Sequence, residues 1–406
     1  MRRHLYLLAA LAAFSVNSNA SMAIVEVQAA DRAARTEVAS LIHVDSIQDD
    51  RIFSIVHTRD LKALGKLKIA KLMGVELITE GKQSEIGTEA NVLDFPAADS
   101  KFHNYDEMLD VLKGLEAGNP GLAHVFSMGR SVEGREIWAI KIGEGETAED
   151  GTEKPAAIFM ATHHAREHVS TEMPIMFAQE LLNNYQTNPR IRDLLKEIDI
   201  YLVPMVNPDG AMYDIDAGNY RWWRKNRCRN SGSSYGVDLN RNYGFGWGTG
   251  GSSSSPSSDV YMGSAPFAEP ETRAIRDFFL AHPNIKIALS LHTFSELILY
   301  PWGGRDEGVG GEDEKALVKM ANDIAKINNY TPMQSSDLYI ASGDTCDWVY
   351  GELSTFCFTF ELSPSSLWGG GFYPGASVID DVYRDNVEAM YYLMDYAADP
   401  ARVLHN

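Results

Sequence analysis

The sequence predicts an α/β fold, a mixed and mostly parallel twisted sheet flanked by helices, preceded by a small α+β unit. Short apolar runs of strand length alternate with helical patterns from about residue 101 to the C-terminus, an order typical of α/β domains. A separate set of strands and helices occupies residues 22–80. The composition, 45% hydrophobic and 23% charged residues in 406, is that of a globular protein.

The first 20 residues have the features of a secretory signal peptide. Arg2 and Arg3 precede an apolar run at residues 5–16, and small residues follow up to Ala20. The run is shorter than the roughly 20 apolar residues that a membrane-spanning helix needs. We therefore expect a secreted or periplasmic protein without a membrane anchor. The net charge of -20 argues against nucleic-acid binding, which requires a basic face.

Residues 21–98 are expected to form a propeptide with a linker. The patterns predict strands at 23–27, 43–47, 52–57 and 75–79, and helices at 31–42 and 60–73. This order, β-α-β-β-α-β, is the split β-α-β arrangement. The unit holds no cluster of metal-ligating residue types, and a polar stretch at 80–99 follows it.

Residues 99–406 are expected to form the catalytic domain. The patterns predict helices at 105–117, 173–185, 188–195, 269–281, 312–328 and 378–396, and strands at 137–142, 156–161, 198–206, 285–292 and 356–362. A glycine- and serine-rich stretch at 248–258 predicts a surface loop.

The stretch HHAREHVS at residues 163–170 offers two metal-binding interpretations. Either His164 and Glu167 are a two-ligand element, or His164 and His168 are both ligands of an inverted zincin with Glu167 as base. An inverted zincin needs both histidines on one helix. Pro174 is tolerated only in a helix's first turn, which predicts a helix that begins after His168. The motif would then lie in a turn, which favours His164 and Glu167.

A catalytic zinc ion keeps three protein ligands and one open position, so a third ligand is needed. The candidate is His292, at the carboxyl end of the strand predicted at 285–292. A single histidine at a strand end is more often simply hydrogen bonded, so the residues alone leave this assignment open.

Six motifs in order complete the pattern: H-x-x-E at 164–167, N-P-D-G at 207–210, R-W-W-R-K at 221–225, G-V-D-L-N-R-N at 236–242, S-L-H at 290–292 and F-T-F-E-L at 358–362. Together they resemble the zinc carboxypeptidases of the carboxypeptidase A/B type, and the bacterial carboxypeptidase T-like members most. The N-terminal unit is similar to that family's inhibitory propeptide.

The resemblance implies one Zn²⁺ per chain, held by His164, Glu167 and His292, with Asp238 orienting His164. His163 and His168 would be flanking residues. Glu361 would act as general base on the attacking water and then as general acid to the leaving amine. Without the resemblance, Glu361 could equally face solvent at the end of its strand.

The other catalytic and substrate-binding roles also come from the resemblance. Arg224 would stabilise the oxyanion, although its surrounding basic run would otherwise suggest solvent exposure. Arg241 would bind the substrate's terminal carboxylate through two hydrogen bonds, which lysine cannot do. The further residues implied at the substrate are Asn240 as a donor, Tyr339 as a mobile closing residue, Arg166, and Phe294.

Specificity depends on two positions in the predicted pocket. Cys346 falls at the floor, where a small, weakly polar side chain suits apolar residues, and Asp344 lies two positions earlier. In the carboxypeptidase T-like type an aspartate there accompanies tolerance of basic residues as well. We therefore expect broad specificity, apolar first. The pairing of Cys228, Cys346 and Cys357 stays open, and a bond at Cys346 would alter the floor.

The sequence thus favours a zinc carboxypeptidase made as a zymogen, a monomer that acts on peptide or protein C-termini and is inhibited by its own propeptide. One alternative is a cell-wall peptide hydrolase on the same scaffold, which loss of the Asn240-Arg241 pair would favour. Another is an inactive binding domain, which would lack a ligand or the base. The sequence contains the Asn240-Arg241 pair, and it also contains every candidate ligand and the candidate base.

Overall fold

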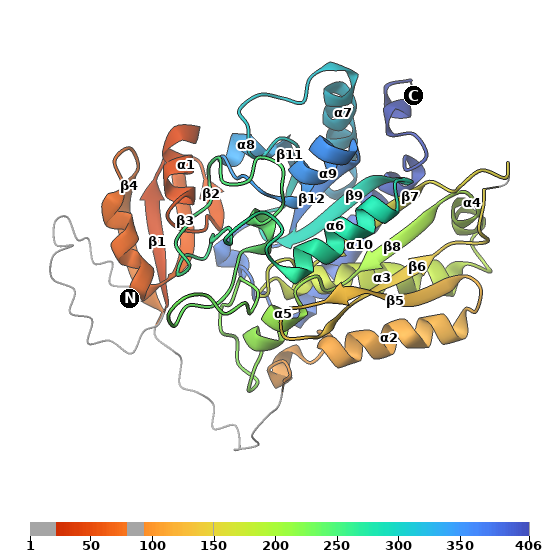
Figure 1. Cartoon of the computed structure of the whole chain (residues 1–406), viewed down its shortest axis with the longest axis horizontal. Coiled ribbons are helices and arrows are strands. Elements are labelled where there is room, and N and C mark those ends of the chain that lie inside the picture. Colours follow the sequence, from red (N-terminus) through yellow and green to blue (C-terminus); the bar gives the residue numbers. More distant parts are fainter. Residues whose placement is uncertain (1–21, 79–92, 149, 406) are drawn as a thin grey trace.

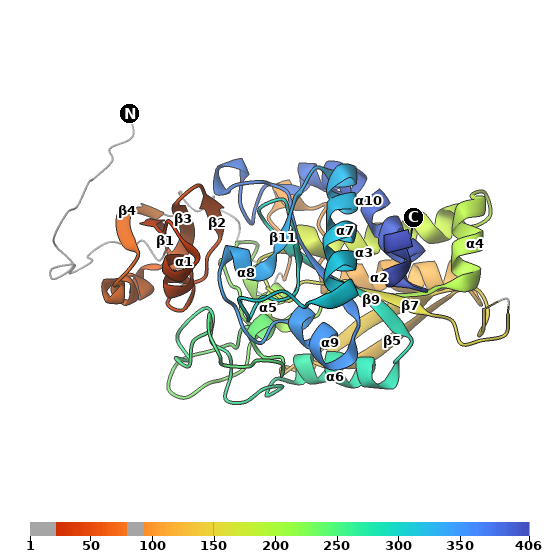
Figure 2. The same ribbon diagram turned by 90° about the horizontal axis from the view of Figure 1, so that it is seen from above.

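The structure is a computed structural model that describes residues 22–78, 93–148 and 150–405. The expected signal peptide and most of the expected linker lie outside these ranges. Two sheets dominate, one of four strands and one of eight. Figures 1 and 2 both place the small N-terminal sheet at one end of the molecule, beside the larger unit. No helix among the described residues combines the length and the apolarity required to cross a bilayer.

The small sheet is antiparallel, with strand order β2-β3-β1-β4. Its strands are β1 (Met22–Gln28), β2 (Ser46–Gln48), β3 (Arg51–His57) and β4 (Lys71–Ile78), and its helices are α1 (Arg32–Ala39) and the 3-10 helix η1 (Thr58–Lys66). Ala23, Val25 and Val27 alternate along β1 and are completely buried in the same apolar cluster as Val38 of α1. This period of two is what a half-covered strand requires.

The helix predicted at 60–73 is wrong in its second half. The helical segment is a 3-10 helix that ends at Lys66, and residues 71–73 belong to β4. The Glu37 carboxylate accepts hydrogen bonds from three consecutive backbone N–H groups, those of Lys68, Ile69 and Ala70. These groups are therefore engaged outside the helix, and the chain turns into the strand.

The large sheet has the order β11-β10-β12-β9-β7-β8-β6-β5. Its strands are β5 (Ala123–Arg130), β6 (Glu136–Ile142), β7 (Ala156–Ala161), β8 (Asp199–Val203), β9 (Ile285–Thr293), β10 (Leu297–Tyr300), β11 (Thr331–Gln334) and β12 (Phe356–Leu362). The central strands β12, β9, β7 and β8 are parallel, whereas β10, β6 and β5 make antiparallel pairs. This confirms the predicted mixed α/β sheet.

Helices cover both faces of the large sheet. They are α2 (Tyr105–Gly118), α3 (His168–Asn184), α4 (Pro189–Glu197), α5 (Pro208–Asp214), α6 (Pro270–Ala281), α7 (Gly311–Asn328), α8 (Ser335–Leu338), α9 (Thr345–Leu353) and α10 (Ile379–Asp395). Apolar residues of α2, α3, α7 and α10 share one core with one face of β7, and those of α6 and α9 share a second core with its other face. All six residues of β7 are consequently buried, as expected of a central parallel strand.

Helix α3 differs from its prediction, because it begins at His168 and contains Pro174 in its interior. Proline lacks the N–H for one helical hydrogen bond. Side chains hold the first turn instead: Ser170 Oγ donates to the Glu167 carbonyl at 2.6 Å, and the hydroxyls of Thr171 and Thr162 lie 2.5 Å apart. The turn that carries His164 and Glu167 still precedes the helix.

Candidate active site

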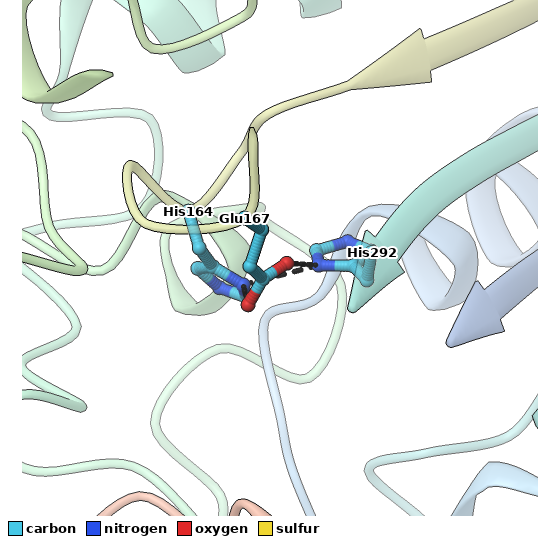
Figure 3. A group of neighbouring side chains, drawn as sticks. All are labelled: His164, Glu167 and His292. Carbon is cyan, nitrogen blue, oxygen red and sulfur yellow. Dashed lines mark hydrogen bonds and ion pairs between the residues drawn. The ribbon is translucent and has the colours of Figure 1, made fainter. Parts of the chain in front are cut away.

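Three side chains from two strand ends converge on one point. His164 and Glu167 lie in the turn after β7, and His292 lies near the end of β9 (Figure 3). His164 Nδ1 is 2.9 Å from Glu167 Oε1, and His292 Nδ1 is 2.9 Å from Glu167 Oε2. The ligand atoms all lie within 4.8 Å of one another, and all three residues are buried. Two imidazoles and one carboxylate are a donor set that suits zinc.

The outer nitrogens of both histidines are also engaged. His164 Nε2 lies 3.1 Å from Asp238 Oδ1, and His292 Nε2 lies 2.9 Å from Ser290 Oγ. Such partners fix the orientation of each ring, so that both Nδ1 atoms face the centre of the group. Burial acts to raise the pKa of Asp238, but Arg224 and His164 together hold it well below its usual range. Asp238 therefore stays ionised as a partner of His164.

The neighbouring histidines point to other partners. His168 Nε2 is 2.9 Å from Asp214 Oδ2. His163 Nε2 is 3.0 Å from the Tyr243 hydroxyl. Neither joins the three-residue group, so the inverted-zincin arrangement does not form among these residues.

Glu361 lies beside the group of His164, Glu167 and His292. It is half-buried on β12, where its Cα pairs in register with that of His292 on β9. Burial and the Glu167 carboxylate both raise the pKa of Glu361 well above its usual range. A carboxyl group in this position can hold or release a proton next to the place where a metal ion would be bound.

Arg224 is buried and not part of a solvent-exposed basic run. Its Nε and Nη2 donate to Asp238 Oδ2 at 3.1 and 2.9 Å, and its Nη1 lies 3.8 Å from Glu167 Oε1. The remaining neighbour of Nη1 is His43 Nε2 of the N-terminal unit, at 3.1 Å. The guanidinium is thus fixed by Asp238 while one of its nitrogens faces the site.

Arg241 and Asn240 lie in a short 3-10 helix, η3 (Leu239–Arg241). The buried Arg241 donates from Nε to the Gly251 carbonyl at 3.2 Å and from Nη1 to the Asn240 carbonyl at 2.7 Å. Asn240 Oδ1 accepts from the backbone N–H of Thr345 at 2.9 Å. Backbone groups therefore hold both side chains in place.

The remaining substrate candidates contact the N-terminal unit. Tyr339 packs against the apolar core of the small sheet, and the next residue, Ile340, donates its N–H to Thr36 Oγ1 of α1 at 3.1 Å. Phe294 packs edge-on against Phe372, with ring centroids 4.9 Å apart. The Arg166 guanidinium lies 4.0 Å above the same Phe372 ring.

The predicted pocket floor is part of a disulfide. Cys346 of α9 is bonded to Cys357 of β12, and Cys228 is free. Asp344 is the N-cap of α9, where its Oδ1 accepts the N–H of Asp347 at 2.9 Å. Its other oxygen is buried and has no hydrogen-bond partner among the residues that the structure describes, and burial raises the pKa of Asp344.

Several residues around the site were missed from the sequence. Asp45 and His43 reach it from the N-terminal unit, and Ser290 and Thr345 contact other candidates. Ser290 alone had a local signal, because it begins the S-L-H motif at 290–292 and lies two residues before His292 on one face of a strand, but no role was assigned to it. The others are brought in by contacts between distant segments, which no local pattern encodes.

Comparison with known proteins decides the family. The family described as zinc carboxypeptidase matches residues 108–389. The chain belongs to the zinc carboxypeptidase family. A relative described as zinc carboxypeptidase, from Saccharothrix mutabilis subsp. capreolus, is 32% identical over 396 residues, 94% of this chain and 90% of that protein.

Other zinc carboxypeptidases agree in sequence and in fold. Carboxypeptidase A1 of Sus scrofa is 34% identical over 301 residues, 73% of this chain and 70% of that protein. The structure of carboxypeptidase A from Helicoverpa armigera has a TM-score of 0.75 at 26% identity, and the match covers 93% of this chain and 98% of that one. The protein is accordingly a metallocarboxypeptidase, a Zn²⁺-dependent hydrolase of peptide C-termini.

Proposed function

We propose that this zinc carboxypeptidase is exported as a zymogen and, once trimmed, removes single C-terminal residues, apolar or aromatic ones first and basic ones second. One observation carries the catalytic part. The group formed by His164, Glu167 and His292 lies beside Glu361 on the adjacent strand, with buried arginines around it. Export rests on the residues that precede Ser21.

The metal would be held by His164 Nδ1, His292 Nδ1 and the Glu167 carboxylate. His164 and His292 counteract burial and lower the pKa of Glu167, so this ligand stays ionised. Bound Zn²⁺ would supply a Lewis acid that polarises the scissile carbonyl and lowers the pKa of a water to about 7. Asp238 and Ser290 would keep the two histidine rings aimed at the ion.

Glu361 would transfer the proton, and Arg224 would stabilise the negative charge of the transition state. Glu361 would take a proton from the attacking water and then deliver it to the nitrogen of the leaving amino acid, so one carboxyl serves as base and as acid. Arg224 would stabilise the negative charge that develops on the carbonyl oxygen. Its salt bridge with Asp238 fixes it before the substrate arrives, which is the arrangement that electrostatic stabilisation requires.

Arg241 and Asn240 would bind the free carboxylate of the substrate. A planar guanidinium matches a carboxylate, and this recognition would confine cleavage to the last peptide bond. Tyr339 would close over the bound residue. Arg166 and Phe294, which lie beside Phe372, would line the part of the site further from the C-terminal residue.

The side-chain preference would be set by the pocket at the start of α9. The disulfide of Cys346 gives a neutral, apolar floor, which supports apolar residues. The unpartnered oxygen of Asp344 would accept a hydrogen bond from a basic residue. Because Cys346 is in a disulfide, the pocket floor offers no free thiol. The proposed acceptance of basic C-terminal residues therefore rests on Asp344 alone.

The N-terminal unit would act as the inhibitory propeptide. Asp45 binds Arg166, His43 contacts Arg224, and the segment that carries Tyr339 is held by α1. A peptide substrate could not reach these arginines while the unit occupies them. Removal of the unit would therefore activate the enzyme.

The test is hydrolysis by the trimmed, zinc-loaded protein of matched peptides that end in Phe, Leu, Arg or Glu, with an amidated Phe peptide as control. We expect release of Phe and Leu, less Arg, and nothing from the amide. Equal cleavage of the amidated peptide would contradict the proposed binding of the substrate carboxylate by Arg241 and Asn240, and would favour an endopeptidase or a cell-wall peptide hydrolase. Inactivity despite bound zinc would favour a binding role.

A further inference from the structure

Asn240 is held on one side by Thr345, the first residue of α9. The Thr345 backbone N–H donates to Asn240 Oδ1 at 2.9 Å, and the Thr345 hydroxyl donates to the same oxygen at 3.0 Å. We infer that Thr345 is a positioning residue of this carboxypeptidase, which turns the Asn240 side-chain NH2 toward the carboxylate of the substrate.

The two donors define which end of the Asn240 amide faces Thr345. A backbone N–H can only donate, so the amide atom that it contacts must be the oxygen. The nitrogen then lies on the opposite side. Among the described residues no atom accepts from Asn240 Nδ2, and Asn240 is half-buried while its neighbours Leu239 and Arg241 are buried. The NH2 is therefore left for a ligand that accepts hydrogen bonds, which a carboxylate does and an ammonium group does not.

The Thr345 hydroxyl also contacts His163 Nε2. Its single proton is committed to Asn240 Oδ1, so at His163 Nε2, 3.2 Å away, the hydroxyl oxygen must accept. His163 then carries its proton on Nε2. The same nitrogen lies 3.0 Å from the Tyr243 hydroxyl, and the buried His163 Nδ1 has no partner within the described part of the chain. An unpartnered lone pair there is a smaller cost than an unpartnered N–H.

The segment that carries Thr345 is itself fixed. Asp344 caps α9 through the N–H of Asp347, and Cys346 is covalently tied to Cys357 on β12. The amide of Asn240 is thus oriented before a substrate binds. Without this contact the amide could present its oxygen to the substrate carboxylate, and two acceptors would repel each other.

The inference rests on the proposed role of Asn240 in the clamp, and a series at position 345 tests it. Thr345→Ser keeps both donors. Thr345→Val keeps only the N–H. Thr345→Pro removes both, and proline is well suited to this position, the first of a helix that follows an extended residue. Thr355→Val is the matched control, because Thr355 is a buried threonine between α9 and β12 whose hydroxyl donates to the Ile285 carbonyl.

KM and kcat are measured on two Phe-terminated peptides, one with a free C-terminal carboxylate and one with a C-terminal amide. The inhibition constants of free phenylalanine and of phenylalaninamide, the zinc content and the thermal midpoint are measured as well. We expect Thr345→Ser and Thr355→Val to leave KM and the phenylalanine inhibition constant within about twofold of wild type. Thr345→Val should raise both about fivefold, the factor of one hydrogen bond, and Thr345→Pro should raise both further. Inhibition by the amide, kcat and zinc content should not change.

Two results would overturn the inference. One is an unchanged KM in Thr345→Val, which keeps the fold even if the proline variant does not. The other is a parallel loss of kcat and zinc content, which would mean a structural role. Failure of the proposed function looks different, because the wild-type protein itself would then not distinguish free phenylalanine from its amide.

Discussion

The carboxylate of Asp45 accepts a hydrogen bond at 3.1 Å from Nη2 of Arg166, and both side chains are fully buried, with 0% exposure. Asp45 comes from the N-terminal unit, where its second oxygen accepts the N–H of Ile55 at 2.6 Å. Arg166 lies between the metal-ligand candidates His164 and Glu167 in the chain. The unit therefore contacts the site through a charged pair shielded from water, and such pairs are strongly sensitive to loss of one partner.

Asp45→Asn in the uncleaved chain should raise its peptidase activity. The change leaves Arg166 buried without its counter-charge, a loss of about 3–5 kcal/mol in comparable buried pairs. Part of this loss will appear as weaker docking of the N-terminal unit. The measurement is hydrolysis of a Phe-terminated peptide by the intact chain, with electrophoresis to show that no cleavage has occurred. Asp50→Asn, on an exposed part of the same unit, is the control. Equal activity of the two variants would contradict the inhibitory role of the pair.

Stability should depend on pH through Asp60. Burial, with the nearby Asp259 carboxylate, raises the pKa of Asp60 to about 6. The folded chain thus binds this proton more tightly than the unfolded chain, so stability is lost as pH rises from about 4 to about 6. Asp60→Asn, which cannot ionise, should raise the thermal midpoint at pH 7 but not at pH 4. The same shift at both pH values would show that ionisation of Asp60 is not the cause.

Glu361→Gln should abolish most activity without loss of the metal. The amide cannot take a proton from water, and loss of a general base typically costs about 100- to 10,000-fold in rate. Metal analysis should still find one zinc per chain, whereas His292→Ala should lose both zinc and activity. Chelation of the wild type should behave as His292→Ala does and be reversed by added zinc. Residual activity of Glu361→Gln near the wild-type level would exclude Glu361 as the base.

Arg241→Lys tests whether binding of the substrate carboxylate needs the geometry of the guanidinium as well as its charge. Lysine keeps the positive charge but cannot form two parallel hydrogen bonds to a carboxylate. We expect KM for free-acid peptides to rise by about tenfold or more, the effect of losing one charge-assisted hydrogen bond. Arg229→Lys, at an exposed arginine five residues after Arg224, serves as the control. An unchanged KM in Arg241→Lys would show that Arg241 does not bind the substrate carboxylate.

The disulfide between Cys346 and Cys357 should contribute to stability. It closes a loop of 11 residues in sequence separation, for which the chain-entropy estimate is about 3 kcal/mol. The double change to serine should lower the thermal midpoint and make it insensitive to a reducing agent that lowers the wild-type midpoint. It should also alter the ratio of activities on Phe- and Arg-terminated peptides, because the bond forms the proposed pocket floor. An unchanged midpoint would show that the bond does not form in solution.

The candidate ligands could be located because they lie at or just after the carboxyl ends of central parallel strands, which meet at one edge of a sheet. The strand ends pointed to His164, Glu167 and His292 as candidates, and the resemblance to the zinc carboxypeptidases implied that all three are ligands. The start of helix α3 was predicted wrongly because proline lacks an N–H, whereas the Ser170 and Thr171 side chains stabilise the first turn, which precedes Pro174. The contacts of His43 and Asp45 depend on docking of one unit onto another, which periodicity does not reveal.

The pairing of Glu361 with His292 across β12 and β9 places the proposed base beside the candidate ligands only when the central sheet has formed. A slip of one residue between these strands would send Glu361 to the opposite face of the sheet. Since β7 and β9 come from distant parts of the chain, a nascent or partly folded polypeptide has no assembled metal site. Uptake of zinc during refolding should therefore be a late event that reports when the central sheet has closed. A chain that carries a peptidase would in this way stay harmless to itself until β12 has paired with β9.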